Sequence, residues 1–124
     1  MIKVKHLMDA VEADDGQRIW VEPINLTRDL REWCCVHELL PQLGPPASLW
    51  KLLEAKPGEA YEYFRGRYHE HLKRGKFQPA LQAMACAGRR ETFTLIHQGI
   101  DPEHNTAEAL REYLNELEAY CQPE

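Results

Sequence analysis

A long helical segment separates the second and third β-rich runs of the chain, and this spacing limits the folds that the sequence can adopt. The three runs, at residues 2–7, 18–23 and 92–97, place apolar and β-branched residues at strand spacing. Parallel strands need a long crossover of this kind, whereas antiparallel neighbours are commonly joined by a tight turn. The first two runs are close enough in sequence to permit either direction. We therefore predict an α/β fold with a small three-stranded, mostly parallel sheet covered by about five helices.

The intervening helices are predicted from apolar residues at helical spacing and from residues that favour helix ends. The first follows Thr27, which can act as an N-cap. A break at residues 41–46 precedes a short second helix. Pro57 and Gly75 are placed to begin and end the third, and a fourth precedes the last strand. The first helix is expected to carry its apolar stripe on Leu30, Trp33, Cys34, His37 and Leu40.

The last helix has the strongest pattern. Asn105 can cap its first turn, and Glu108, three residues later, can complete a capping box. Leu110, Leu114, Leu117 and Cys121 then recur on one face. We expect Leu110, Leu114 and Leu117 to pack against the sheet.

Length and composition limit the class of protein. The 124 residues predict a single domain over residues 1–124. A formal net charge of −5 argues against a nucleic-acid partner, since such proteins usually carry a basic excess. No signal-peptide pattern and no long apolar run occurs, so we expect a cytoplasmic location and no membrane partner. Thiols stay reduced in the cytoplasm, so all four cysteines are expected to be free: Cys34, Cys35, Cys86 and Cys121.

Polar side chains gather where the predicted strands end. In parallel α/β sheets, ligands bind beyond the carboxyl ends of the strands. We call this edge of the sheet the carboxyl edge. His6, Glu22 and His97 lie at or near the three strand ends, and Asp101, His104 and Asn105 lie in the loop after the third strand. A parallel sheet would bring all six to one place.

Three interpretations of these residues stay open. Asp101 and Asn105 are ordinary helix-starting residues, so a strand-to-helix turn explains the segment by itself. A binding or regulatory module would hold a small polar ligand or a protein partner at the carboxyl edge. A small enzyme would use His97 or His104 as an acid or base, oriented by Asp101. We favour binding over catalysis, because no obvious nucleophile or cofactor loop is present, and the sequence leaves a homo-oligomer open.

The signals for metal binding and for a nucleophile are weak. Cys34, Cys35 and His37 form one cluster, but helix neighbours two residues apart do not face the same way. His69 and His71 are also two residues apart, so their side chains would point in different directions from a helix, and no zinc-binding motif occurs. Cys35 and Cys86 fall on or beside apolar helix faces, where inert thiols are expected. We therefore predict no metal site and no cofactor.

Four stretches of the chain resemble one protein family, in the same order. They are "IKVKHLMDA…DDGQRIWVE", "LREWCCVHEL", "YEYFRGRYHEHL" and "LIHQGIDPEHNTAEAL". Together they resemble the YeaO-like branch of the family catalogued as domain of unknown function 488, and they cover nearly the whole chain. The resemblance implies a small cytoplasmic α/β protein and brings no established activity with it.

The chain departs from the family pattern at the predicted strand ends. His6 stands where relatives usually have arginine, and Pro23 replaces a second arginine. The run from His97 to Gly99 replaces Tyr-Ala-Ala, whereas Asp101, His104 and Asn105 fit the family's closing segment. Compared with its relatives, this chain has lost most of the basic charge at the strand ends, so the resemblance does not predict an anion-binding role here.

Overall fold

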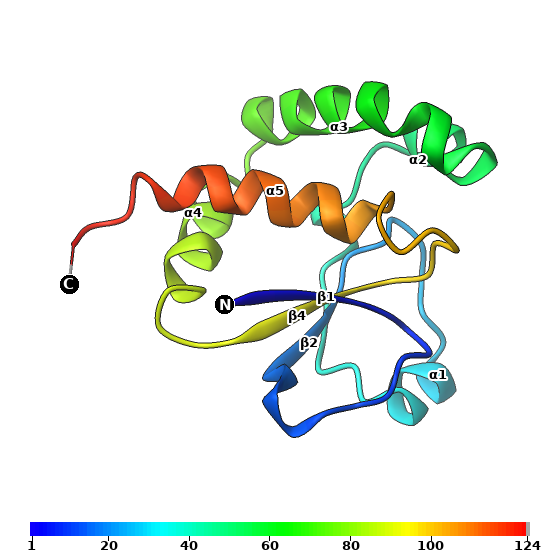
Figure 1. The fold of residues 1–124 in the computed structure, drawn as a ribbon, viewed down its shortest axis with the longest axis horizontal. Coiled ribbons are helices and arrows are strands. Elements are labelled where there is room, and N and C mark those ends of the chain that lie inside the picture. Colours follow the sequence, from blue (N-terminus) through cyan, green and yellow to red (C-terminus); the bar gives the residue numbers. More distant parts are fainter. Residues whose placement is uncertain (124) are drawn as a thin grey trace.

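A parallel four-stranded sheet forms one layer of the protein, in a computed structural model that describes residues 1–123. The strands are β1 (Ile2–His6), β2 (Gln17–Trp20), β3 (Glu38–Leu39) and β4 (Phe93–His97). Their order is β1-β4-β2-β3, and every neighbouring pair is parallel (Figure 1). The predicted α/β class and parallel direction are therefore confirmed. The prediction of three strands is wrong by one, since β3 was not foreseen.

The extra strand lies where the sequence predicted the end of the first helix. Helix α1 spans only Arg28–Trp33; Thr27 caps it as expected by accepting a hydrogen bond from the backbone N–H of Leu30. Cys35 then adopts a positive φ of 53°, which ends the helix and turns the chain toward β2. Cys34 and Val36 are buried in a small core against Trp20, whereas Trp33 is 80% exposed. Packing against the sheet has overridden the helical spacing.

The other helices lie close to their predicted positions. They are α2 (Ala47–Ala55), α3 (Pro57–Arg74), α4 (Gln78–Ala87) and α5 (Thr106–Glu118), and 3₁₀ turns occur at Ala13–Asp15 and Pro41–Leu43. Helix α5 packs along β1 and β4, and α3 lies on the side of α5 away from the sheet (Figure 1). The two faces of the sheet are therefore covered unequally, with the larger helical layer on the α5 side.

The main core lies between this helical layer and the sheet. Phe93 and Leu95 of β4 point into it, and Leu110 and Leu114 of α5 are buried against them. Leu117, farther along α5, is only partly buried. The inward packing predicted for α5 is thus confirmed for the first two leucines and partial for the third.

A charged cluster includes strand residues that point away from the main core, to the other face of the sheet. The buried carboxylate of Asp15 pairs with Arg18 at 2.8 Å, and with Lys3 at 2.7 Å and Lys5 at 2.8 Å from β1. Arg18 is itself fully buried. Because β4 separates β1 from β2, Asp15 connects two strands that share no backbone hydrogen bonds.

The prediction of four free thiols is wrong. Cys86 of α4 and Cys121, just beyond α5, form a disulfide with a Cα–Cα distance of 5.6 Å. Helices α4 and α5 pack side by side, and this contact brings together two cysteines that are 35 residues apart in sequence. Cys34 and Cys35 remain free.

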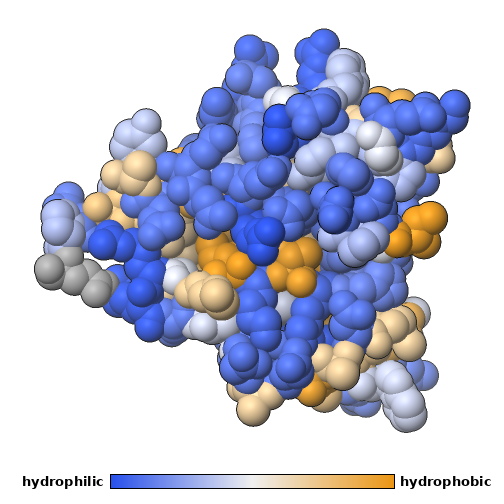
Figure 2. Space-filling view, viewed as in Figure 1, coloured by the Kyte–Doolittle hydropathy of each residue, from blue (hydrophilic) through white to orange (hydrophobic). Residues whose placement is uncertain are grey.

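The surface in the view of Figure 2 is mostly hydrophilic, with small apolar areas between charged side chains. Within residues 1–123, no helix combines the length and apolar character needed to cross a membrane.

Candidate functional site

The ends of β1 and β4 bring two histidines together. His6 and His97 are register partners, so both occupy the carboxyl edge of the sheet. Their rings meet edge to face, with centroids 5.4 Å apart. Alternate residues of a strand point to the same face of the sheet. In β1, Ile2 and Val4 point toward the main core, and in β4 Phe93 and Leu95 do so. His6 and His97 continue these two series, so both side chains face the α5 side of the sheet.

His6 is held by two backbone groups. Its Nδ1 atom accepts a hydrogen bond from the N–H of Met8 at 3.0 Å, and its Nε2 atom lies 3.2 Å from the carbonyl oxygen of Gln98. Since Nδ1 must accept and Nε2 must donate, the neutral ring carries its proton on Nε2. Both nitrogens of His6 are therefore satisfied within the protein.

Glu22 lies behind these histidines and is fully buried. Its carboxylate accepts hydrogen bonds from the backbone N–H of Gln98 at 3.1 Å and the indole N–H of Trp50 at 3.2 Å. Burial raises the pKa of Glu22, although these donors and the neighbouring hydroxyl of Thr106 act in the opposite direction. Glu22 thus fixes the loop after β4 and the position of α2, and does not itself face solvent.

His97 differs from His6 because one of its nitrogens has no partner. The residue is 3% exposed, and its Nδ1 atom is buried without a hydrogen bond. The backbone of Gly99 lies beside the ring but does not meet hydrogen-bond geometry. Burial, followed by the positive field of His6, lowers the pKa of His97 to about 4. The ring is therefore neutral at pH 7 and presents an unsatisfied nitrogen inside the protein.

Gly99 leaves room beside this nitrogen. A Cβ atom added to Gly99 would lie 3.6 Å from Nδ1 of His97, 3.4 Å from Cβ of Asn105 and 3.9 Å from Oε1 of Glu54. These are ordinary contact distances, so one further carbon atom fits there. Glu54 belongs to α2, one turn after Trp50, and sequence reasoning missed it together with Gly99. The i, i+4 spacing of Trp50 and Glu54 places both on one helix face, but which face meets the sheet is decided by tertiary packing.

A cavity of about 300 Å³ opens between the β1 edge and the loop after β4. Both histidines and Gly99 border it, and the charge of Asp9 lies at its rim. The lining residues are Val4, Lys5, His6, Asp9, His97, Gly99, Ile100 and Pro102.

The remaining predicted residues build the turn that starts α5. Asp101 accepts hydrogen bonds from the backbone N–H of Glu103 at 2.9 Å and of His104 at 3.2 Å. Asn105 caps α5 by accepting from the N–H of Glu108, and it donates to the carbonyl oxygen of Asp101. The predicted reciprocal bond from the Glu108 side chain is not formed; that carboxylate pairs with Arg111. The turn interpretation therefore describes the backbone role of this segment.

His104 points away from His97. Its Nδ1 atom lies 2.9 Å from Oδ2 of Asp101, and its ring packs edge to face on Tyr61 of α3. The hydrogen bond from the Glu103 backbone, followed by that from His104, lowers the pKa of Asp101. His104 lines a different cavity, of about 450 Å³, together with Glu112. The structure thus brings His6, Glu22 and His97 together and places the Asp101–His104 pair at a separate cavity.

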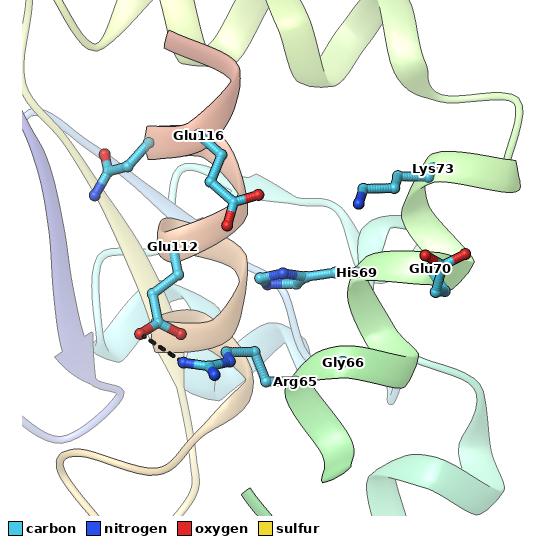
Figure 3. Close-up of a pocket in the computed structure, with 8 residues that line it drawn as sticks. Arg65, Gly66, His69, Glu70, Lys73, Glu112 and Glu116 are labelled. Carbon is cyan, nitrogen blue, oxygen red and sulfur yellow. Dashed lines mark ion pairs between the residues drawn. The ribbon is translucent and has the colours of Figure 1, made fainter. Parts of the chain in front are cut away.

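Another cavity, of about 720 Å³, lies between α3 and α5 and away from the strand ends (Figure 3). Its side chains largely satisfy one another. Arg65 pairs with Glu112 at 3.6 Å, and His69 bonds the carbonyl oxygen of Ala109 at 2.7 Å. Lys73 and Glu116 project toward the gap from opposite helices (Figure 3). Acidic and basic groups alternate there, and nothing selects one sign of ligand charge.

The side chains that could bind a metal or act as a nucleophile are already engaged or lie away from the carboxyl edge. Among residues 1–123, the one close group of three potential metal ligands is Glu12, Asp14 and Asp15, and lysines and Arg18 already hold these carboxylates. Cys86 is engaged in the disulfide, and Cys35 is exposed on the turn after α1.

Comparison with known proteins identifies the family to which the chain belongs. No curated protein and no solved structure matches the chain. One family model matches residues 3–114, a stretch that includes all four strands except the first residue of β1, and α5 as far as Leu114. The chain therefore belongs to the family described as domain of unknown function DUF488.

Proposed function

We propose that the chain binds a small polar ligand at the carboxyl edge of its sheet, in the cavity bordered by His6, His97 and Gly99. The observation that carries this proposal is the buried Nδ1 atom of His97, which has no partner. Leaving a polar group buried and unpaired costs about 1–3 kcal/mol, and most buried polar groups in native proteins are paired. A ligand that hydrogen-bonds Nδ1 would recover this cost.

The residues around the cavity hold its walls in place before a ligand binds. His6 and Glu22 are fully engaged with the protein, so they hold the loop after β4 in place. Asp101 and Asn105 fix the far end of the same loop. A prearranged pocket binds with a smaller ordering cost than a flexible one. A cavity of about 300 Å³ is at the small end of the range for ligand sites.

Gly99→Ala tests the proposal. The added methyl group would occupy the space beside Nδ1 at ordinary contact distances, so the fold should survive while the ligand is excluded. A set of small polar compounds would be screened by thermal shift against the wild type and Gly99→Ala. Gly58→Ala is the matched control, since nothing lies within 4 Å of its added carbon. Stabilisation that is lost in Gly99→Ala and kept in Gly58→Ala supports the site; stabilisation equal in all three contradicts it.

A second candidate function is acid–base catalysis by His104. The specific observation is its 2.9 Å contact with Asp101, which would orient the ring. No Ser, Thr or Cys lines its cavity, so water would be the nucleophile. The test is hydrolysis of chromogenic esters and phosphodiesters by the wild type and His104→Gln. Turnover that disappears in His104→Gln would support the enzyme, and turnover equal to the buffer rate in both would remove it.

We also infer that the chain is a divergent member of the YeaO-like branch. The four matching stretches and the closing Asp101, His104 and Asn105 support this placement. The replaced strand-end residues then imply that the ligand differs from that of less divergent relatives.

A further inference from the structure

We propose that the cavity of about 720 Å³ between α3 and α5 is a second binding site, and that it takes a small zwitterion of the amino-acid type. The carboxylate of the ligand would lie at Lys73 and its ammonium group at Glu116. We call this cavity the interhelix cavity. It is separate from the carboxyl edge, so the inference does not rest on the proposed function.

The two walls of the interhelix cavity carry opposite charges. Arg65, His69 and Lys73 follow one another in steps of four residues along α3, so their side chains form one row on a single helix face. Glu112 and Glu116 form a second row on α5 with the same spacing. The basic row faces the acidic row across the cavity (Figure 3). A ligand between the helices therefore meets cations on one side and carboxylates on the other.

The two rows meet at one end of the cavity and stay apart at the other. Arg65 and Glu112 form an ion pair at 3.6 Å. Lys73 and Glu116 project toward the gap from opposite helices, but neither forms an ion pair or hydrogen bond within the part of the chain that the structure describes (Figure 3). Gly66 also lines the cavity, and nothing lies within 4 Å of a Cβ atom added to it, so the space beside α3 is open.

His69 supplies an acceptor on the same wall as Lys73. The residue is only 9% exposed, and its Nε2 atom lies 2.7 Å from the carbonyl oxygen of Ala109. A carbonyl oxygen can only accept, so Nε2 carries a proton and Nδ1 is the acceptor of the neutral ring. Nδ1 has no hydrogen-bond partner among residues 1–123 and keeps contact with solvent. Because Ala109 holds the ring, this acceptor is in place before a ligand binds.

The charges of the walls favour a ligand that carries both signs. An anion attracted to Lys73 would be repelled by Glu116, and a cation attracted to Glu116 would be repelled by Lys73. Glu70, which also lines the α3 wall, pairs with Arg74 at 3.6 Å, so its charge is offset. A zwitterion aligned across the cavity places each of its charges beside the opposite one. The volume of the interhelix cavity is within the range of small-molecule sites.

Probes of matched chemistry test the need for both charges. β-Alanine, γ-aminobutyrate and ε-aminocaproate are zwitterions with increasing charge separation, whereas butylamine and butyrate each carry one charge. Binding would be followed by the ¹⁵N chemical shifts of the His69 ring, which reports on the interhelix cavity, and of the His97 ring, which reports on the carboxyl edge. We expect at least one zwitterion to shift Nδ1 of His69 in a saturable manner, and butylamine and butyrate to leave it unchanged at the same concentrations.

Charge reversal tests the two residues that would hold the ligand. Lys73→Glu and Glu116→Lys each place like charges across the cavity, so each should weaken zwitterion binding about ten-fold. The double variant restores opposite charges in the reverse order, and a ligand turned end for end should bind again. Lys51→Glu and Glu38→Lys are the matched controls, since they make the same changes at exposed positions outside the cavity and should leave the affinity unchanged.

The possible results separate this inference from the proposed function. A zwitterion that shifts His97 and leaves His69 unchanged would overturn the inference while supporting a ligand at the carboxyl edge. Equal binding of the singly charged probes, or zwitterion binding that survives both single reversals, would also overturn it. So would a double variant that binds no better than the single ones, because charge complementarity would then not explain the loss. If no zwitterion shifts His69, the interhelix cavity is not a site of this kind.

Discussion

Asp15→Asn should be one of the most costly conservative changes in this protein. The buried carboxylate of Asp15 forms ion pairs with Arg18 at 2.8 Å and with Lys3 and Lys5 of β1. Lys3 and Lys5 keep partial access to water, but the Arg18 side chain is fully buried and already has one unpaired nitrogen, Nη2. Removing the charge of Asp15 would leave a buried guanidinium without a carboxylate partner and with the carbonyl oxygen of Cys34 as a remaining acceptor.

The expected magnitude follows from the loss of that partner. Removing one partner of a buried ion pair costs about 3–5 kcal/mol. Asparagine keeps one acceptor oxygen, so we expect a loss of about 3 kcal/mol in the free energy of unfolding. With a urea m value of about 1.5 kcal/mol/M, the midpoint would fall by about 2 M. Asp14→Asn is the control: its side chain is 81% exposed, and its loss should cost no more than about 0.5 kcal/mol.

The same change should alter the pH dependence of stability. Burial opposes ionisation of Asp15, but its hydrogen bonds from Lys3, Lys5, the Glu12 backbone and Arg18 together hold its pKa well below the usual range. The stabilisation is therefore present above the unfolded pKa of about 3.9 and is lost as the pH falls toward the folded pKa. The gap between wild type and Asp15→Asn should narrow from pH 5 to pH 2. A cost below about 1 kcal/mol at pH 7, or a constant gap, would refute this reasoning.

Four further predictions can be checked by standard measurements. Leu114→Ala should lower the free energy of urea unfolding by about 2–5 kcal/mol, because the side chain is fully buried, and a neutral result would contradict its core role. Asn105→Ala should cost about 0.5–2 kcal/mol in the same assay, since both the cap and the bond to the preceding loop are lost. The folded pKa of His97 is about 4, below its unfolded value of 6.5, so protonation favours the unfolded chain as the pH falls. The free energy of unfolding of the wild type should therefore fall by roughly 2–3 kcal/mol from pH 7 to pH 4 because of His97 alone, and His97→Gln should remove this contribution to the pH dependence. Thiol titration in denaturant without reductant should count two free cysteines, rising to four after reduction of Cys86–Cys121; four before reduction would rule the disulfide out.

The sequence predicted those features that depend on local pattern or on strand direction. The crossover length predicted the parallel sheet, and the spacing of Leu110 and Leu114 predicted the buried face of α5. The meeting of His6 with His97 followed from parallel strand ends. These inferences need only periodicity and topology.

The features that were missed depend on how distant segments dock. Strand β3 forms because Cys34 and Val36 pack on the sheet, and this contact outweighs a helical pattern. Glu54 reaches the site only because α2 lies over the strand ends, and no local signal reports this. The disulfide likewise results from the packing of α4 on α5. Of the predicted polar residues, His6 and His97 line one cavity and His104 lines another, because Asp101 holds the His104 ring against Tyr61.

The position of β4 also has a consequence for how the chain folds. β4 lies between β1 and β2, so Ile2 finds its partner at Phe93, and Gln17 pairs with the same residue from the other side. Neither amino-terminal strand has a sheet neighbour, except the two-residue β3, until the ribosome has released the segment that contains β4. Pairing over such a separation gives a high contact order and slow folding. During synthesis, the alternating apolar and basic residues of β1 must therefore remain unpaired, and its lysines help to keep that exposed edge from pairing with other chains.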